Sequence, residues 1–565
     1  MWNERFKLSF VLVLLSIVIL SIFVRLIYLQ IYKHKDYLNY AENQSLRKVQ
    51  LLKNRGLIYD RRGAVLAENK KTASLYVYGR DIKDPYRIKL ILKDYNLNMN
   101  SRNYNYLRKR EGFIWLIRNI KVDKARKISG RYPYIHYILQ ENRYYPKGEN
   151  VAKIVGFTGV DNQGLQGVEY ALDKKLKGEK TNVIYLRDSR NRPILLKDKE
   201  YISESSKGVY LTIDSEIQET AGIILKKDMK RFGAKKAIAA GINVNTGEII
   251  FSVSYPSYDP DSFEKYSKST WKSMLTNYLF EPGSIFKAIT FGFLLENENL
   301  NLNKQVDCEN GRYTVYGHTY NDVHDYDKLK ASEVIINSSN IGTVKLISEA
   351  SGKKFHKFLS KVGFGESSDV LGVSEEKGLL RDYDKWSGLS KPSISIGQEI
   401  YVTPLQILQY YAAVANDGVL VSPHLIKKAV KGEEVFKPDI KSKKWLSENS
   451  AKTLQMLLKK VVDNGTGVNA SSDYVDIGGK TGTAQKFLID KGRYSYKNYV
   501  ASFVGFFPAT SPEVAMIVIY DSPSVSIYGG STAAYTFESI AEQIMLNKGY
   551  KIQRLRVSSE TKKAS

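Results

Sequence analysis

The pattern of apolar and polar positions separates a short apolar start from a long mixed remainder. Residues 8–24 are apolar apart from three serines, and the apolar character continues through residues 26–32. This stretch is long enough to cross a bilayer as one helix. Because no small-residue cleavage site closes it, we expect an uncleaved anchor over residues 8–31. Residues 1–7 are expected to stay in the cytoplasm, which places the remainder outside the cell.

Beyond the anchor, strand-like and helix-like patterns alternate, which is typical of an α+β protein. Residues 55–67 have the pattern of a strand, a charged Asp-Arg-Arg-Gly turn and a second strand. Residues 80–140 are rich in Lys, Arg, Tyr and Asn with loose helical spacing, and predict a small α+β lobe. We assign these features to an N-terminal domain over residues 32–204. A charged tail, residues 551–565, is expected to be disordered.

A second domain is predicted over residues 205–550. Its first strand ends at Asp214, which is placed to cap a helix that continues to about Met229. A hairpin follows over residues 237–253, with an Asn-Thr-Gly turn. Three consecutive antiparallel strands are predicted between residues 480 and 520. This order of elements indicates an antiparallel sheet accompanied by helices.

Composition and charge narrow the environment of the protein. Its 565 residues include one cysteine, Cys308, and carry a net charge of +26 from 85 basic and 59 acidic side chains. A single cysteine excludes an intramolecular disulfide framework. The positive surplus suits an anionic neighbourhood such as lipid or wall polymer, or reflects a low-GC genome that encodes many lysines. Because the lysines are dispersed and no nucleic-acid-binding motif is present, no nucleic-acid partner is expected.

The segment Glu281-Pro282-Gly283-Ser284-Ile285-Phe286-Lys287 joins a Pro-Gly turn to an apolar stretch with helical spacing. The turn predicts that Ser284 lies at a helix N-terminus, where free N–H groups favour negative charge. Lys287 lies three residues later on the same face, and a desolvated lysine amine can take the proton of a serine hydroxyl. Ser-x-x-Lys alone is weak evidence, because ordinary helices also contain it.

Two later segments strengthen this interpretation. Ser338-Ser339-Asn340 predicts a tight turn between two helices, the second starting near Thr343, and could aim a hydroxyl and a carboxamide at one point. The alternative is that these residues merely cap a helix. Lys480-Thr481-Gly482-Thr483 begins the first of the three predicted strands. Its lysine and hydroxyls can bind a carboxylate, and its edge can hydrogen-bond an extended peptide.

The three motifs in this order resemble those of penicillin-binding proteins and serine β-lactamases. Three N-terminal segments extend the similarity, namely Arg55-Gly56-Leu57, Arg143-Tyr144-Tyr145-Pro146 and Gly167-Val168-Glu169. Over nearly its whole length the chain resembles the class B penicillin-binding proteins, which are monofunctional peptidoglycan transpeptidases, and is nearest to their division and sporulation branch. The resemblance implies an α+β transpeptidase domain, with an antiparallel sheet, flanking helices and a helical lobe. This domain would stand on an elongated, dimerisation-like N-terminal pedestal with one transmembrane helix.

The resemblance also implies the roles of the site residues. The catalytic residues are Ser284, Lys287, Ser338, Asn340 and Lys480, and the substrate-binding residues are Thr481, Gly482 and Thr483. Ser284 would attack the penultimate D-alanine carbonyl of a stem peptide, with Lys287 as general base. The N–H groups of Ser284 and Thr483 would form the oxyanion hole. Ser338 would relay a proton to the departing D-alanine, and Asn340 would hold the peptide amide.

A metal site is a further hypothesis, because Cys308, His318, Asp322, His324 and Asp325 fall between the first two motifs. Thiolate, imidazole and carboxylate groups are zinc ligands, and some class B relatives carry such a site near this position. We predict a structural zinc held by Cys308, Asp322 and His324, with His318 or Asp325 as the fourth ligand. The alternative is a polar loop with one reduced cysteine. The chemistry itself requires no cofactor.

The predicted function is that of a membrane-anchored serine D,D-transpeptidase that cross-links stem peptides and is acylated by β-lactams. A β-lactamase, a β-lactam sensor or mainly a scaffold for wall synthesis are alternatives. A secreted β-lactamase needs neither anchor nor pedestal, and a sensor usually has several spans. The family implies stem peptides, β-lactams, the membrane, a SEDS-type glycosyltransferase and other divisome or septal proteins as partners. Division, elongation and sporulation stay open as the setting.

Overall fold

The computed structural model describes residues 4–52, 55–177, 180–187, 193–194, 207–370, 375–431, 434–488 and 493–547. The chain forms two compact units. The smaller comprises Met1–Asn54 and Gly178–Ser205, and the larger comprises Arg55–Lys177 and Ser206–Ser565. The predicted tail, residues 551–565, lies outside the described residues.

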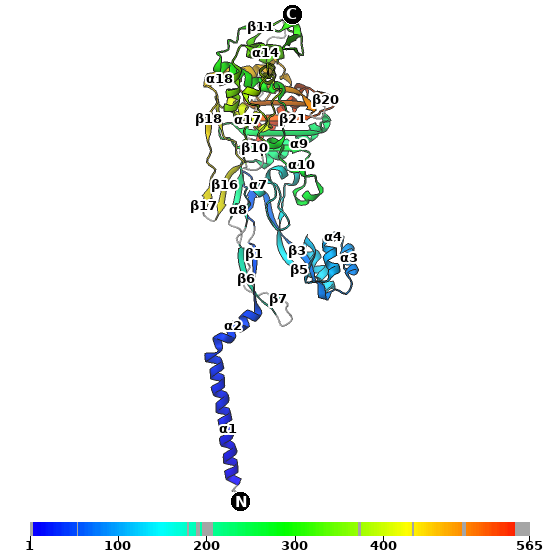
Figure 1. Ribbon diagram of the computed structural model, residues 1–565, viewed down its shortest axis with the longest axis vertical. Coiled ribbons are helices and arrows are strands. Elements are labelled where there is room, and N and C mark those ends of the chain that lie inside the picture. Colours follow the sequence, from blue (N-terminus) through cyan, green and yellow to red (C-terminus); the bar gives the residue numbers. More distant parts are fainter. Residues whose placement is uncertain are drawn as a thin grey trace. The chain divides into compact units, whose positions relative to one another are not determined.

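The smaller unit contains the apolar helix predicted from the sequence. Its elements are α1 (Glu4–Ile27), the π-helical turn η1 (Tyr28–Tyr32), α2 (His34–Ser45), and the sheet β1 (Leu46–Leu52), β6 (Lys180–Arg187) and β7 (Pro193–Ile194). Figure 1 shows α1 as one long helix. Its 24 residues extend about 36 Å, which exceeds the roughly 30 Å of a bilayer core. The span Phe6–Tyr32, with a mean hydropathy of 3.0 and no buried residues in its most apolar window, fits the expected anchor in length and composition.

The larger unit begins with the α+β lobe that the sequence predicted. It consists of β3 (Val65–Tyr78), α3 (Pro85–Asp94), α4 (Ser101–Lys109), β4 (Phe113–Ile120), α5 (Val122–Arg131) and β5 (His136–Tyr144). Strand β3 pairs with both β4 and β5. Leu75 and Val77 of β3 and Leu116 of β4 are fully buried, in one core with helix residues such as Ile88 and Leu107. The helices therefore cover one face of this small sheet.

A buried ionic group joins the three N-terminal motifs. The side chains of Arg55 and Glu169 are at most 2% exposed, and Arg55 Nε lies 2.5 Å from Glu169 Oε2. Arg143 Nε lies 2.6 Å from the other oxygen, Oε1. Arg55 also contacts Asp173 at 2.6 Å. Because removing one member would leave a buried charge unpaired, this group fixes how the motifs pack.

One sheet runs across the boundary predicted near residue 205. Its further strands are β2 (Leu57–Tyr59), β8 (Lys207–Leu211), β16 (Ile426–Lys431) and β17 (Glu434–Phe436). Strand β2 forms the predicted hairpin with β3 and pairs in parallel with β8, which in turn pairs with β16. The order is therefore β17-β16-β8-β2-β3-β4, with β5 also on β3. Segments far apart in the sequence form one hydrogen-bonded layer.

The central sheet of the larger unit has five antiparallel strands, as predicted. They are β9 (Lys236–Asn243), β10 (Ile249–Tyr255), β19 (Gly478–Leu488), β20 (Arg493–Phe507) and β21 (Val514–Asp521), in the order β10-β9-β21-β20-β19. Alternate residues of β9 enter two different cores, Ala237 and Ala239 in one, Ile238 and Ala240 in the other. Both faces are therefore covered by helices.

Helices α9 (Ser215–Arg231) and α19 (Ala533–Asn547) supply the core on one face, and α12 (Lys287–Asn297) and α17 (Pro404–Ala415) supply it on the other. Asp214 caps α9 through the N–H groups of Glu216 and Ile217, as predicted. The helical region also contains α13 (Ala331–Ile336), α14 (Asn340–Ser348), α15 (Gly352–Lys361), α16 (Ser390–Ser395) and α18 (Glu448–Asn464).

The short elements are α6 (Ala152–Val155), α7 (Gly167–Ala171), α8 (Asp173–Leu176), α10 (Lys268–Trp271), α11 (Met274–Asn277), β11 (Gln305–Asp307), β12 (Arg312–Val315), β13 (His318–Asn321), β14 (Lys328–Lys330), β15 (Val419–Val421) and β18 (Ser442–Lys444). Strands β12 and β13 form a hairpin, and β11 pairs with β14. This small region precedes α13 and leads the chain to the Ser-Ser-Asn turn.

Candidate active site

Ser284 occupies the short helical turn η5 (Gly283–Phe286), which continues directly into α12. Every residue in 281–294 is buried except Ser284, which is partly exposed. Gly283 has φ +58°, and a Cβ there would lie only 3.0 Å from the carbonyl oxygen of Thr483 on β19. Glycine thus lets the serine turn approach the strand closely. The prediction that Ser284 lies at the start of a helix is confirmed.

The Ser-Ser-Asn turn connects α13 and α14, and Ser338 within it has φ +60°. Helix α14 begins at Asn340, three residues earlier than the predicted start at Thr343. Ser339 caps this helix, since its hydroxyl accepts a hydrogen bond from the Gly342 N–H at 2.9 Å, and a carboxylate from outside the turn supports the same start. Asp322 accepts hydrogen bonds from the N–H of Asn340 at 2.5 Å and of Ile341 at 3.1 Å. It therefore satisfies N–H groups that a helix start leaves unpaired.

The three motifs meet at the Ser338 hydroxyl. Lys287 Nζ donates to the Ser338 carbonyl at 2.5 Å and to Asn340 Oδ1 at 2.7 Å, and lies 3.3 Å from Ser338 Oγ. Lys480 Nζ lies 2.8 Å from the same Oγ. The structure thus brings together four of the five predicted catalytic residues by direct contact, and places the fifth, Ser284, one helical turn before Lys287.

Both lysines are fully buried, which changes their chemistry. Burial lowers the pKa of the Lys287 amine to about 7, against an opposing influence from the Asp322 carboxylate. Burial and repulsion from Lys287 lower the pKa of Lys480 well below its ordinary value. Two ammonium groups cannot both keep their charge at such a site. An uncharged amine suited to accept a proton is therefore available near neutral pH.

The predicted substrate-binding residues lie on β19, the last strand of its sheet. Thr481 Oγ1 lies 2.8 Å from Thr466 Oγ1, and Thr483 Oγ1 accepts a hydrogen bond from the N–H of Gly529 at 3.3 Å. A Cβ on Gly482 would lie 2.4 Å from Ser502 Oγ, so only glycine fits there. The threonine hydroxyls are held in fixed positions along an edge strand, where an extended peptide can pair.

Glu281 is a supporting residue that sequence reasoning missed. Its Oε1 accepts hydrogen bonds from the Glu399 N–H at 2.8 Å and the Tyr494 hydroxyl at 3.1 Å. Burial raises the pKa of Glu281 to about 7. It ties the segment before Ser284 to the loop at residue 399 and to β20. The only signal in the sequence was an acidic residue next to an apolar run, and its partners are more than 100 residues away.

The predicted zinc site is not formed by the described residues. Cys308 is buried with its Sγ 3.7 Å from Ser339 Oγ, while the Asp322 carboxylate is engaged at the start of α14. His318 packs against Tyr320, and His324 packs against Tyr326. Within the described ranges, no group of three or more His, Cys, Asp or Glu side chains could hold a metal ion. Asp325, the other proposed fourth ligand, belongs to no such group either. The side chains have the right chemistry but do not converge.

Comparison with known families accounts for this arrangement. Residues 237–545 match the penicillin-binding protein transpeptidase domain, and residues 51–213 match the penicillin-binding protein dimerisation domain. The first match alone covers more than half of the chain. The chain belongs to the class B penicillin-binding proteins. The predicted family, fold class and enzyme class, a serine-type peptidoglycan D,D-transpeptidase, are confirmed.

Several proteins are similar to this penicillin-binding protein over most of their length. Stage V sporulation protein D of Bacillus subtilis is 30% identical over 98% of this chain and 88% of its own. Peptidoglycan D,D-transpeptidase FtsI of Escherichia coli is 29% identical over 91% of this chain and 87% of its own. The crystal structure of penicillin-binding protein 3 of Mycobacterium tuberculosis, complexed with aztreonam, shares the fold with a TM-score of 0.68 and 24% identity, covering 89% of this chain and 98% of that one.

Proposed function

We propose that Ser284 is the nucleophile of the transpeptidase and that Lys287 is its general base. The observation that supports this most directly is the meeting of two buried lysines at Ser338, one turn of helix from the partly exposed Ser284. A lysine with a pKa of about 7 can take the hydroxyl proton at neutral pH. Neither an ordinary helix cap nor a surface lysine has this environment.

In the first half-reaction, Ser284 Oγ forms an ester with the penultimate D-alanine carbonyl of a stem peptide. The peptide bond to the terminal D-alanine breaks, and its nitrogen receives the proton that Lys287 removed, relayed through Ser338. In the second half-reaction, an amine of a neighbouring stem peptide attacks the ester. A new amide bond forms and Ser284 regains its proton, so atoms and charges balance over the cycle.

The remaining residues bind and orient the substrate in this proposal. The N–H groups of Ser284 and Thr483 hold the developing oxyanion. Asn340 binds the peptide amide. The terminal carboxylate lies against Lys480 and the hydroxyls of Thr481 and Thr483. An arriving carboxylate favours the charged form of Lys480, which burial otherwise disfavours, so this lysine gains its proton as substrate binds.

The cellular setting is also part of the proposal. Helix α1 spans the cytoplasmic membrane once, with residues 1–7 inside and the transpeptidase domain, residues 205–550, outside. A SEDS-type glycosyltransferase and septal proteins are the partners that the family suggests. The similarity to stage V sporulation protein D and to peptidoglycan D,D-transpeptidase FtsI supports a role in septal wall synthesis. β-Lactams, which resemble the D-Ala-D-Ala terminus, acylate the same serine.

The test is covalent labelling by a fluorescent penicillin. We expect intact mass spectrometry to show one adduct per chain and peptide mapping to place it on Ser284. Ser284→Ala should lose the adduct completely while keeping its thermal unfolding temperature, since this residue is partly exposed and the change removes only a hydroxyl. An adduct elsewhere, or full labelling of Ser284→Ala, would overturn the proposal. Rapid turnover of the penicillin in place of a stable adduct would instead favour a β-lactamase.

A further inference from the structure

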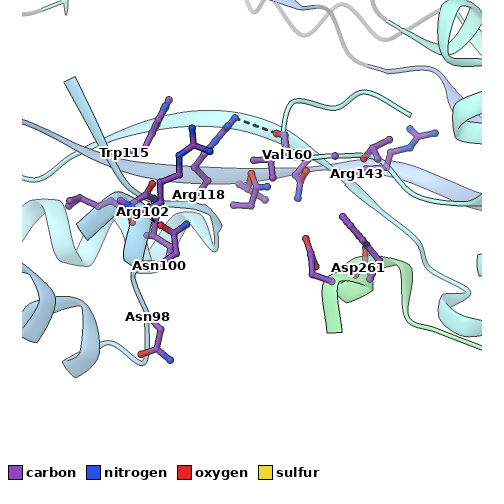
Figure 2. Close-up of a pocket in the computed structure, with 18 of the residues that line it drawn as sticks. Asn98, Asn100, Arg102, Trp115, Arg118, Arg143, Val160 and Asp261 are labelled. Carbon is purple, nitrogen blue, oxygen red and sulfur yellow. Dashed lines mark hydrogen bonds between the residues drawn. The ribbon is translucent and has the colours of Figure 1, made fainter. Parts of the chain in front are cut away.

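A large cavity lies in the larger unit away from the Ser284 site. Its volume is about 1110 Å³. The walls come from the α4 region of the lobe, from β4 and β5, from residues 158–160, and from the helical turn η4 (Pro260–Lys265). Figure 2 shows Asn98 and Asn100 on one side of this space and Asp261 on the other. A volume at the upper end of small-molecule sites suggests a ligand of several linked rings.

The lining of this cavity restricts the chemistry of that ligand. It contains five asparagines and six aromatic side chains. The lining has four basic and three acidic residues, so their charges nearly cancel and a strongly charged polymer of either sign is disfavoured. A purely apolar ligand would leave many amide and guanidinium groups without partners. The composition suits a neutral ligand that offers hydroxyl and amide groups on flat-faced rings.

One wall of the cavity is held in place by contacts of the Arg118 side chain. Its Nη1 donates to Asp161 at 2.9 Å, and its Nη2 donates to the Val160 carbonyl at 3.3 Å, the bond drawn in Figure 2. The guanidinium lies 5.1 Å from the centre of the Trp115 ring, and Phe113 meets that ring edge-on at 4.8 Å. A held cation stacked on an indole is a preorganised aromatic wall, which lowers the entropy cost of binding.

Two further polar side chains, Asn98 and Arg102, lie on the same side of this space in Figure 2 as Trp115 and Arg118. In the described part of the chain, no hydrogen bond or ion pair engages the side chains of Asn98 and Arg102. Asn100 and Asn103 do serve the fold, because Asn100 caps α4 and Asn103 contacts the Leu116 carbonyl. Asn98 and Arg102 are therefore two donors that remain available to a ligand.

We propose that this cavity binds the glycan strand of peptidoglycan, a chain of N-acetylated amino sugars. Pyranose faces stack on aromatic rings, and acetamido and hydroxyl groups pair with carboxamides and guanidinium groups. The inference rests on the proposed function, because the stem peptides that reach Ser284 are attached to such strands. The site would hold the strand at a distance from the reacting peptide and leave the acylation chemistry unchanged.

The test measures binding of the β-1,4-linked tetramer of N-acetylglucosamine, a neutral probe, to the full chain in detergent by calorimetry. The informative variant is Asn98→Ala/Arg102→Ala. Its matched control is Asn105→Ala/Arg108→Ala, which removes the same side-chain types from exposed positions of α4, the helix that carries Arg102, outside the cavity lining. We expect Kd to rise about tenfold or more in the first variant and to stay unchanged in the second.

Penicillin labelling of Ser284 separates this proposal from the proposed function. Both variants should be acylated at the wild-type rate, so a loss of glycan binding with intact labelling supports the cavity site alone. Absence of glycan binding by the wild-type chain would overturn the proposal, as would equal loss in both variants. Unchanged glycan binding with loss of a partner protein from the first variant would show that the cavity receives a protein segment, and would also overturn it.

Discussion

The lysine–serine cluster and the predicted zinc ligands make an instructive pair of neighbouring regions. Both were predicted because their side chains have suitable chemistry, yet only the first converges. Lys287 lies on α12, Ser338 on a turn between two helices, and Lys480 on β19. Cys308 and Asp322 lie outside the regular strands of a small loop region. Lys287 and Lys480 thus come from regular elements that fix the direction of their side chains, whereas Cys308 and Asp322 contact residues at the start of α14.

The comparison also shows what Asp322 does. Its carboxylate accepts hydrogen bonds from the start of α14 and from the Ser339 hydroxyl at 2.5 Å. Two N–H groups, a hydroxyl and the helix dipole stabilise this carboxylate at the helix start. A residue predicted as a metal ligand therefore holds the Ser-Ser-Asn turn beside Lys287 and Lys480. Asp322 therefore supports the lysine–serine cluster.

The strongest way to break the cluster is to remove the base. Lys287→Met replaces a buried amine by an apolar side chain of similar length, so the fold should survive. We expect the rate of acylation by a fluorescent penicillin to fall about 10³-fold, the contribution typical of a general base. Stopped-flow measurement checks this. A rate within tenfold of wild type would remove Lys287 from the mechanism.

The same base predicts a pH dependence. Because burial lowers the pKa of Lys287 to about 7, the charged form dominates below that pH and cannot accept a proton. The acylation rate should rise about tenfold per pH unit up to pH 7 and then level off. Lys287→Met should show no such inflection. An inflection that persists in this variant would belong to another group.

Two substitutions distinguish a role in the lysine–serine cluster from a role in metal binding. Asp322→Asn removes the charge from the α14 start, which should slow acylation about tenfold and lower the unfolding temperature. Cys308→Ala removes a buried thiol that touches Ser339 only weakly, and should leave acylation within about twofold. Zinc content is measured for both proteins. Stoichiometric zinc in the wild type, lost together in both variants, would restore the metal site.

The smallest expected effect concerns Glu281, which supports the segment before Ser284. Burial raises the pKa of Glu281 from 4.5 to about 7, so the folded protein holds a proton that the unfolded chain releases between these pH values. Stability contributed by this proton declines as pH rises through that window. Glu281→Gln keeps a neutral group there and should flatten the fall of unfolding temperature between pH 5 and 7.5. Identical slopes for both proteins would exclude Glu281 as the source.

Much of this architecture could be predicted because the informative signals were local. The Asp214 cap, the 237–253 hairpin and the three final strands follow from turn residues and strand periods within short windows. The motifs Ser-x-x-Lys and Lys-Thr-Gly were placed correctly for the same reason. Each carries its own helix or strand signal, and the family pattern then implied that they meet.

The features that could not be predicted depend on partners distant in the chain. At the start of α14, Ser339 is a local cap, but Asp322 adds hydrogen bonds from 18 residues away. Glu281 depends on Tyr494, 213 residues away, and this contact leaves no local pattern. The described residues do not support the zinc hypothesis for a related reason, since residue types were known but their competing hydrogen bonds were not. Which hydrogen-bond partner a side chain takes depends on all the groups that the folded chain brings near it.

The parallel pairing of β2 with β8 has a practical consequence for anyone who wishes to truncate the protein. A fragment starting at residue 207 would keep the whole serine site, yet it would expose the edge of β8 that β2 covers. Exposed strand edges pair with other chains, so such a fragment should aggregate when produced. Starting at Arg55 keeps β2 in place but removes β1, which pairs with β6 over seven residues, so a fragment that exposes neither edge must include β1 as well.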